Sequence, residues 1–186
     1  RTVEELIALA KAKPGAIDYA NAGNGSTPHL NMVLFMSMAG IQLNTIVYKG
    51  STPGRMAVLS GEVPVMIDGL APTLQLIQTG KLRALGVTSA RRVPTVSQIP
   101  AIAEAVPGYT GEIWYGMLAP AGTPPDIVNR LQRALAAGFN TPEVKAKLVR
   151  EGGEVVGSTP AEFGAFIKRE LAKWTKVIKE SGTRAE

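Results

Sequence analysis

The stretch YANAGNGSTPHLNM, residues 19–32, decides how this chain folds and what it can bind. A short apolar run leads into two glycines, then into Ser-Thr-Pro and the only histidine of the sequence. Serine and threonine are favoured where a helix begins, and proline is tolerated in the first helical turn. The glycines let backbone N–H groups approach a ligand closely. The stretch therefore predicts a strand, a tight loop and a helix start, a combination that suits an anion.

The first turn of a helix carries backbone N–H groups without helical partners and a partial positive charge. We therefore expect free amides at residues 22–29, helped by the hydroxyls of Ser26 and Thr27, to bind a carboxylate. His29 is expected to be neutral there, because the positive helix end disfavours imidazolium. An ordinary capped helix with a packing histidine remains the alternative. The candidate residues of this loop are Ala22, Gly23, Asn24, Gly25, Ser26, Thr27 and His29.

The loop does not match the common phosphate motifs. No Gly-Lys-Ser/Thr follows the glycines, and the third glycine position of a dinucleotide fingerprint holds Pro28. With one histidine, no cysteine and no Asp/Glu cluster at ligand spacing, we expect no metal site. No residue pattern orients His29 as a catalytic base. The sequence therefore predicts no cofactor and no catalytic residues.

Strand and helix patterns alternate through the first part of the chain. Thr2 and Glu5 have capping-box spacing at the start of the first predicted helix. Regular alternation of this kind is typical of an α/β protein with a parallel or mixed sheet. The predicted strands are 16–20, 43–48, 63–67 and 82–88, and the helices between them are 29–39, 55–60 and 71–80.

The second part of the chain has a different pattern. Residues 89–112 are rich in proline and predict a crossover, so we place a domain boundary near residue 107. Beyond it, apolar periodicity predicts long amphipathic helices and few strands. The predicted strands are 112–120 and 154–157, and the predicted helices are 126–139, 142–151 and 160–181.

Three further residues have both a structural and a functional interpretation. Lys49, in the loop YKGSTPG, is either a solvated cation or a clamp on the ligand. Asp68 follows the apolar run VPVMI, so it either caps a helix or accepts a hydrogen bond from a ligand amine or hydroxyl. Trp114 either packs in a core or lies beside the ligand.

Composition limits the partners. The chain has 186 residues, a net charge of +5 and no cysteine, so disulfides and thiol chemistry are excluded. The basic pair Arg91-Arg92 has no interleaved aromatic residue, which argues against nucleic acid. No run reaches the ~18 apolar residues of a membrane span, and no signal peptide pattern is present. The opening RTVEELIALAK has no methionine and reads as the inside of a helix, so we expect the true start to lie elsewhere.

Several segments together resemble one family, the Bug-type (TctC-type) solute receptors of tripartite tricarboxylate transporters. The segments are YANAGNGSTPHLNMVLF, YKGSTPG, SGEVPVMIDG, GKLRALGVTSARR, WYGMLAPAGTP and GSTPAEF, in this order along the chain. The resemblance implies a periplasmic, non-enzymatic receptor with a periplasmic-binding-protein-like (type II) fold, in which two α/β lobes flank a cleft. It also implies that a di- or tricarboxylate, an acidic amino acid or an aromatic acid binds there, for delivery to membrane permease subunits.

The resemblance also assigns residues and domains. It implies that the loop 22–27 and the helix start after it hold one carboxylate, with His29 in the same motif. Asp68 and the turn at Lys49 would face the cleft from the same lobe. Members of the family carry a further N-terminal segment, so we expect residues 1–107 to be one complete lobe and 108–186 the C-terminal part of the other. A half-lobe exposes apolar surface, so we expect that self-association or another segment stabilises it.

Two other functions are compatible with a glycine loop that holds an anion. One is a metabolic enzyme acting on a phosphate or carboxylate, which would need an acid–base pair from His29, Asp68 and Lys49. The other is the effector-binding domain of a regulator, although no helix-turn-helix pattern or basic cluster accompanies it.

Overall fold

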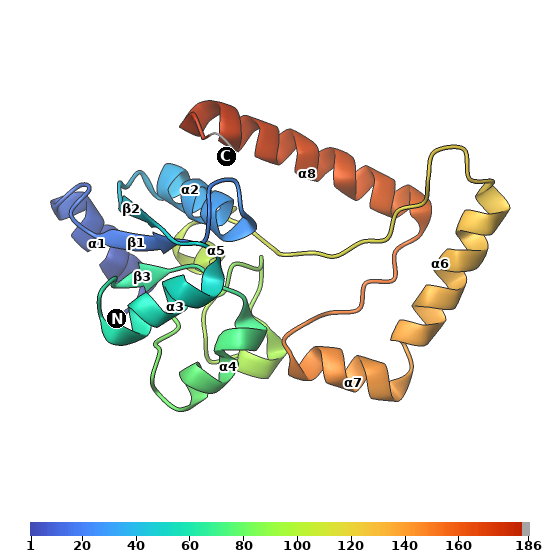
Figure 1. Ribbon diagram of the computed structural model, residues 1–186, viewed down its shortest axis with the longest axis horizontal. Helices are drawn as coiled ribbons and strands as arrows, with labels where there is room; N and C mark the ends of the chain where they lie inside the picture. The colour runs from blue at the N-terminus through green and yellow to red at the C-terminus, as the bar shows by residue number, and fades with distance from the viewer. Residues whose placement is uncertain (184–186) are drawn as a thin grey trace. The chain divides into compact units, whose positions relative to one another are not determined.

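The computed structural model describes residues 1–183 (Figure 1). The chain consists of two compact units. The first unit comprises Arg1–Ile113 and the chain from Lys176 onward, and the second comprises Trp114–Thr175. None of the helices within residues 1–183 is long and apolar enough to cross a membrane.

A small parallel sheet forms the centre of the first unit. Its strands are β1 (Asp18–Asn21), β2 (Asn44–Val47) and β3 (Val65–Met66), in the order β2-β1-β3. Tyr19 of β1 faces Thr45 of β2 on one side and Val65 of β3 on the other. The middle strand β1 is buried from Tyr19 to Asn21, as a strand with neighbours on both edges should be.

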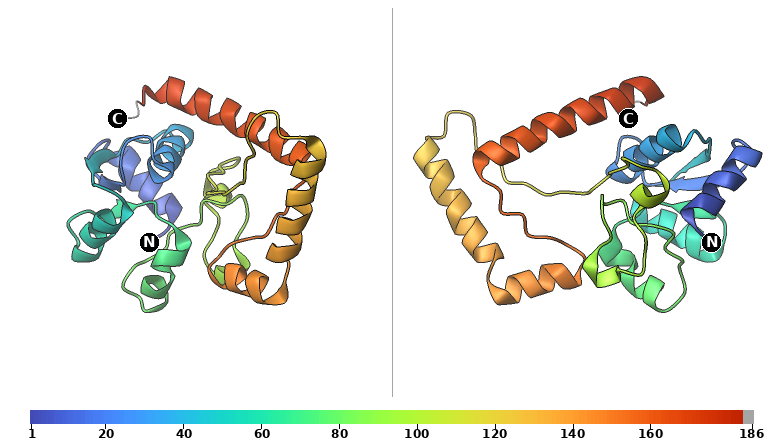
Figure 2. Two further views of the ribbon diagram at one scale, coloured as in Figure 1. Left: turned by 45° about the vertical axis from the view of Figure 1, so that its right-hand side comes forward. Right: turned by 180° about the vertical axis from the view of Figure 1, so that it is seen from behind.

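Helices surround this sheet, as Figures 1 and 2 show. The helix α1 starts with the predicted capping box of Thr2 and Glu5, and α2 ends at Gly40 in a left-handed conformation. The helices of the first unit are α1 (Val3–Ala12), α2 (Thr27–Ala39), α3 (Ser51–Ser60), α4 (Leu70–Gln78) and α5 (Ile102–Ala105), with a 3₁₀ turn at Pro94–Val96.

The helix α3 packs closely against the sheet through a glycine. A Cβ atom added to Gly54 would lie 3.4 Å from the Cβ of Ala20 in β1. Ala57 of the same helix joins Ala20 and Val63 in a buried cluster. Small residues at this contact bring the start of α3 to the edge of the sheet where the strands end.

Three predicted strands are absent from residues 1–183. The stretches 82–88, 112–120 and 154–157 have irregular backbone, apart from an isolated bridge between Val87 and Ala101. Those predictions were wrong because apolar, β-branched sequence forms a strand only where a neighbouring strand accepts its hydrogen bonds. In the part of the chain that the structure describes, these stretches have no such neighbour beyond that single bridge.

The second unit contains long helices and one aromatic cluster. Trp114 packs edge-to-face against Phe163 and Phe166 of α8, with ring centroids 5.7 and 5.2 Å away. Neither α6 nor α7 contains a buried residue, so the apolar stripes of both helices are accessible to solvent. The helices are α6 (Pro125–Phe139), α7 (Pro142–Arg150) and α8 (Pro160–Ser181), whose last residues, from Lys176, belong to the first unit.

A buried asparagine ties residues 109–111 to α2. The Nδ2 of Asn31, a side chain with no exposed surface, donates to the carbonyl of Gly111 at 2.6 Å. The hydroxyl of Tyr109 donates to the Asn31 carbonyl at 3.1 Å. A Cβ atom on Gly111 would lie 2.5 Å from the Asn31 Oδ1, so only glycine fits.

We predict that Gly111→Ala destabilises the first unit by about 1–3 kcal/mol, because the new methyl group displaces Asn31 and breaks its hydrogen bond. The matched control is Gly164→Ala in α8, where no atom lies within 4 Å of the added Cβ. There the better helix propensity of alanine should raise stability by roughly 0.5–1 kcal/mol. Urea unfolding of both variants measures the difference, and equal midpoints would contradict the prediction.

Candidate functional site

The candidate site lies at the edge of the sheet where all three parallel strands end. The chain leaves β1 through α2 to β2 on one side, and β3 lies on the other side of β1. In open parallel sheets, ligands bind at the point where strand order reverses, just beyond the carboxyl ends of the strands. Here that point is between the loop 22–27, after β1, and Asp68, after β3.

The side chain of Asn21 shapes the loop after β1. It is 1% exposed, its Nδ2 donates to the Asn24 Oδ1 at 2.9 Å, and its Oδ1 accepts the Gly23 N–H at 3.0 Å. Gly23 and Gly25 both have positive φ, at 119° and 77°, which residues with a Cβ rarely adopt. The loop is therefore held in one shape by internal bonds and needs glycine at both positions.

The helix α2 is capped by Ser26. The Ser26 Oγ accepts the His29 N–H at 3.4 Å, and Thr27 is the first helical residue. Because Ser26 takes the capping role, neither the N–H nor the hydroxyl of Thr27 makes a hydrogen bond with any described residue. The serine hydroxyl keeps its proton available for donation, since it acts here as an acceptor.

His29 is buried and held as a neutral imidazole. It is 8% exposed, and its Nδ1 accepts the Gly25 N–H at 3.0 Å. Burial lowers the pKa of His29 below 6.5, and the Gly25 bond favours the same neutral form, because Nδ1 must keep its lone pair to accept it. The proton therefore lies on Nε2, which has no partner among residues 1–183.

The structure differs from the expectation of free amides throughout residues 22–29. The N–H groups of Gly23 and Gly25 bond within the loop, and the Ser26 N–H donates to the Gly23 carbonyl at 3.1 Å. A glycine loop this tight satisfies its own polar groups, as buried backbone generally must. The donors without a described partner are fewer: the amides of Ala22 and Thr27, two hydroxyls, and the His29 Nε2.

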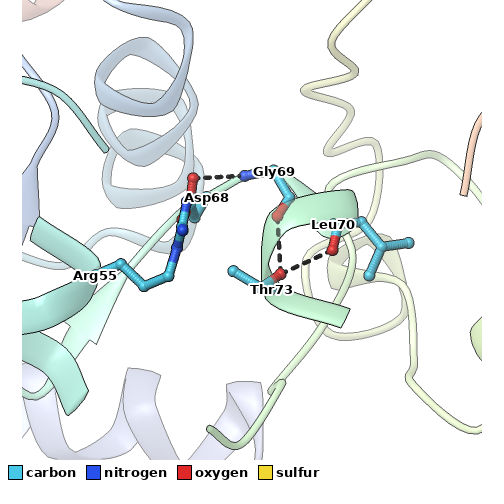
Figure 3. Close-up of polar contacts among 5 residues, drawn as sticks. All are labelled: Arg55, Asp68, Gly69, Leu70 and Thr73. Atoms are coloured by element: carbon cyan, nitrogen blue, oxygen red, sulfur yellow. Dashed lines mark hydrogen bonds and ion pairs between the residues drawn. The ribbon is translucent and has the colours of Figure 1, made fainter. Parts of the chain in front are cut away.

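Asp68 forms an ion pair across the edge of the sheet (Figure 3). Its Oδ2 lies 2.7 Å from the Nε of Arg55 on α3, and its Oδ1 accepts the Gly69 N–H at 2.8 Å. The side chain of Asp68 is 6% exposed and that of Arg55 is 16% exposed. Thr73, one turn into α4, bonds to the Gly69 carbonyl at 2.8 Å and fixes the start of that helix. Asp68 is thus part of a fixed, largely buried group.

The other two candidates have different surroundings. Lys49 is exposed between β2 and α3, and no ion pair holds its ammonium group in the described part of the chain. Trp114 belongs to the second unit, where it packs on Phe163 and Phe166 while remaining 42% exposed. Within the described ranges, no group of three or more His, Asp or Glu side chains could hold a metal ion.

Sequence reasoning missed two residues that organise the site. Asn21 had a local signal, because an asparagine before a glycine turn often bonds to the backbone two residues on. Arg55 had none. It lies 13 residues before Asp68, and only the crossover from β2 to β3 brings the two charges together.

The fold and this polar edge define a class. A parallel α/β unit with a capped helix start and polar side chains at its switch point is typical of an α/β protein that binds a small ligand there. Comparison with known families then gives a specific assignment. The chain belongs to the TctC family, the tripartite tricarboxylate transporter family receptors, whose model matches residues 1–183.

Individual relatives agree with the family. A protein of Pseudomonas sp. (strain P51), described as a UPF0065 protein in the tcbD-tcbE intergenic region, is 35% identical over 97% of this chain. The R. palustris protein Rpa4515, solved with adipate, is 36% identical with a TM-score of 0.85 over 100% of this chain. The periplasmic binding protein BugD is 34% identical with a TM-score of 0.81 over 100% of this chain.

The chain covers 54% of the Pseudomonas protein, 62% of the Rpa4515 chain and 63% of the BugD chain. It thus spans about half of the first and less than two thirds of the solved structures. The expected α/β, periplasmic-binding-protein-like fold and the Bug/TctC resemblance are confirmed. The family consists of solute-binding receptors, so the enzyme interpretation is set aside.

We predict that His29 makes stability depend on pH. Its pKa is lowered in the folded state, so the unfolded chain binds the extra proton first and stability falls as the pH drops below 6.5. Above pH 6.5, the neutral His29 makes its full contribution to the free energy of unfolding. The slope reaches at most about 1.4 kcal/mol per pH unit and ends at the folded pKa.

Urea unfolding at several pH values, for the wild type and His29→Gln, measures this effect. Carboxylates titrate in both proteins, so the difference between the two curves isolates the only histidine. Parallel curves from neutral to mildly acidic pH would contradict the prediction.

Proposed function

We propose that this chain is part of an extracytoplasmic solute receptor that binds a small organic carboxylate and delivers it to a tripartite tricarboxylate transporter. The observation that carries the proposal is the set of donors without described partners at the switch point: the Thr27 N–H, the hydroxyls of Ser26 and Thr27, and the His29 Nε2–H. All of them come from one helix start, where the helix dipole also favours a negative charge.

These donors are sufficient for useful affinity. A hydrogen bond to a charged group contributes about 1.5–3 kcal/mol. Three or four such bonds are comparable with the roughly 8 kcal/mol of micromolar binding, before ordering costs are subtracted. A neutral His29 suits this role because its Nε2–H can donate without adding a charge that burial would oppose.

The remaining candidates define the class of ligand. Rpa4515 was solved with adipate, which supports a dicarboxylate for this chain, with tricarboxylates, acidic amino acids and aromatic acids as further members of the class. Lys49 would attract the anion, and the remaining lone pairs of Asp68 would accept a ligand hydroxyl or amine. Trp114 would contact the apolar part of the ligand. The loop residues 22–25 would hold this arrangement in shape.

We also propose that residues 1–107 form one complete lobe and residues 108–186 the C-terminal part of a second lobe. Supporting this, the chain changes unit after Ile113, and the stretch 112–120 has strand-like sequence but no described strand beside it. The exposed apolar stripes of α6 and α7 would then be covered by the rest of that lobe or, failing that, by self-association.

The proposed setting follows from the family. A receptor of a tripartite transporter would act in the periplasm and meet the membrane permease subunits after binding its ligand. Nucleic acid has no part in this function. Closure of two lobes around the ligand would present a different surface to the permease than the open form does.

Calorimetry with the purified full-length protein tests the proposal directly. The panel comprises adipate, succinate, citrate, glutamate and benzoate, and the control is adipamide, which has the length of adipate without its charge. Binding of at least one acid, with none of the amide, is the expected result. Failure of every acid to bind would contradict the proposed function.

We predict that Thr27→Ala weakens carboxylate binding by roughly tenfold or more, because one charge-assisted hydrogen bond is lost. The matched control is Thr141→Ala, which removes the same side chain from the Thr-Pro start of α7, in the second unit. The control should bind as the wild type does. Equal affinities for both variants would remove Thr27 from the site.

A further inference from the structure

The ion pair between Arg55 and Asp68 presents an electrostatic problem for a site that binds acids. Asp68 lies two residues beyond β3, at the switch point, with only 6% of its side chain exposed. A carboxylate with so little exposed surface repels a ligand carboxylate bound at the neighbouring strand end, because a charge shielded from solvent is only weakly screened. An acid-binding site at this edge therefore requires that the charge of Asp68 be balanced.

Arg55 provides this balance from a suitable position. It lies in the first half of α3, the helix that leaves β2 at the same edge of the sheet. Its Nε is 2.7 Å from the Asp68 Oδ2, and its side chain is only 16% exposed, so the pair is shielded from solvent screening. The other carboxylate oxygen is held by the Gly69 N–H (Figure 3).

Resting on the proposed function, we propose that Arg55 is a positioning residue that neutralises Asp68 and thereby allows the carboxyl edge of the sheet to accept a ligand carboxylate. The pair keeps Asp68 in place, with lone pairs free for a hydroxyl or amine of the ligand, at no net charge. Arg55 thus determines the preference for acids over neutral ligands without itself being required to touch them.

If Arg55 acts through its charge, removing the charge of Asp68 as well should restore binding. If Arg55 has a purely structural role, it should not. Arg55→Met keeps most of the length and apolar stem of the side chain but leaves Asp68 unpaired. Two like charges about 10 Å apart, at an effective dielectric constant of about 20, change a binding constant by roughly tenfold. We predict that Arg55→Met weakens binding of a dicarboxylate by about this factor or more.

Removing the second charge should reverse the loss. Asp68→Asn alone is expected to bind a dicarboxylate more tightly than the wild type, because Arg55 then acts unopposed. The double variant Arg55→Met/Asp68→Asn should recover most of the affinity lost in Arg55→Met. Arg55→Lys, which keeps the charge, should stay close to the wild type.

Calorimetry with the ligand that the wild type binds best, on the full-length protein, measures all four variants. The matched control is Arg92→Met, which breaks the exposed pair of Arg92 and Glu104, also 2.7 Å long, and should leave affinity unchanged. Circular dichroism and urea unfolding establish that each variant is folded. If Arg55→Met alone does not fold, the double variant is compared with the wild type instead.

The outcomes separate the two proposals. If the wild type binds no carboxylate, the proposed function fails and this inference fails with it. If the wild type binds but Arg55→Met binds equally well, or the double variant remains as weak as Arg55→Met, only the neutralising role of Arg55 is overturned.

Discussion

The shape of the loop between β1 and α2 depends on the two hydrogen bonds made by the side chain of Asn21. This residue ends the central strand β1, and its buried amide bonds to both Gly23 and Asn24. A loop with two glycines has many conformations in the unfolded chain, so an internal anchor is needed to select one. With the loop fixed, the Gly25 N–H reaches the His29 Nδ1, and the imidazole proton is directed to Nε2.

These internal hydrogen bonds change the way in which the helix start can bind an anion. If all the amides of a loop pointed outward, any N–H group shielded from water in the unliganded protein would lack a hydrogen bond, and this would lower the stability of the fold. Here most loop amides are satisfied internally, and the donors left without described partners at the helix start are hydroxyls, one helical amide and a neutral imidazole. Such donors discriminate by geometry as much as by charge, which suits a family whose members bind small solutes.

Charge balance at the same edge comes from a different part of the chain. The β2-to-β3 crossover carries α3 past β1 and places Arg55 against Asp68, 13 residues apart in sequence. Burying one of these charges alone would cost more free energy than burying the two together. Because the pair is shielded from water, separating the charges is unfavourable. Close packing of α3 at Gly54 and Ala57 sets that burial.

The amino-acid sequence by itself determined the helices, the α/β alternation of the first unit and the loop that begins α2, because capping residues, glycine stops and apolar periodicity act within a few residues. The sequence also predicted a neutral His29 from its place on a helix start, whereas in the structure the causes are burial and the bond from the Gly25 N–H. Only the tertiary structure decided which expected strands exist, because 82–88 and 112–120 need partners that sequence periodicity does not reveal. The same is true of the ion-pair partner of Asp68, which lies 13 residues away on α3. Which hydrogen bonds and ion pairs form depends on distances between segments, and a local pattern of residues contains no information about those distances.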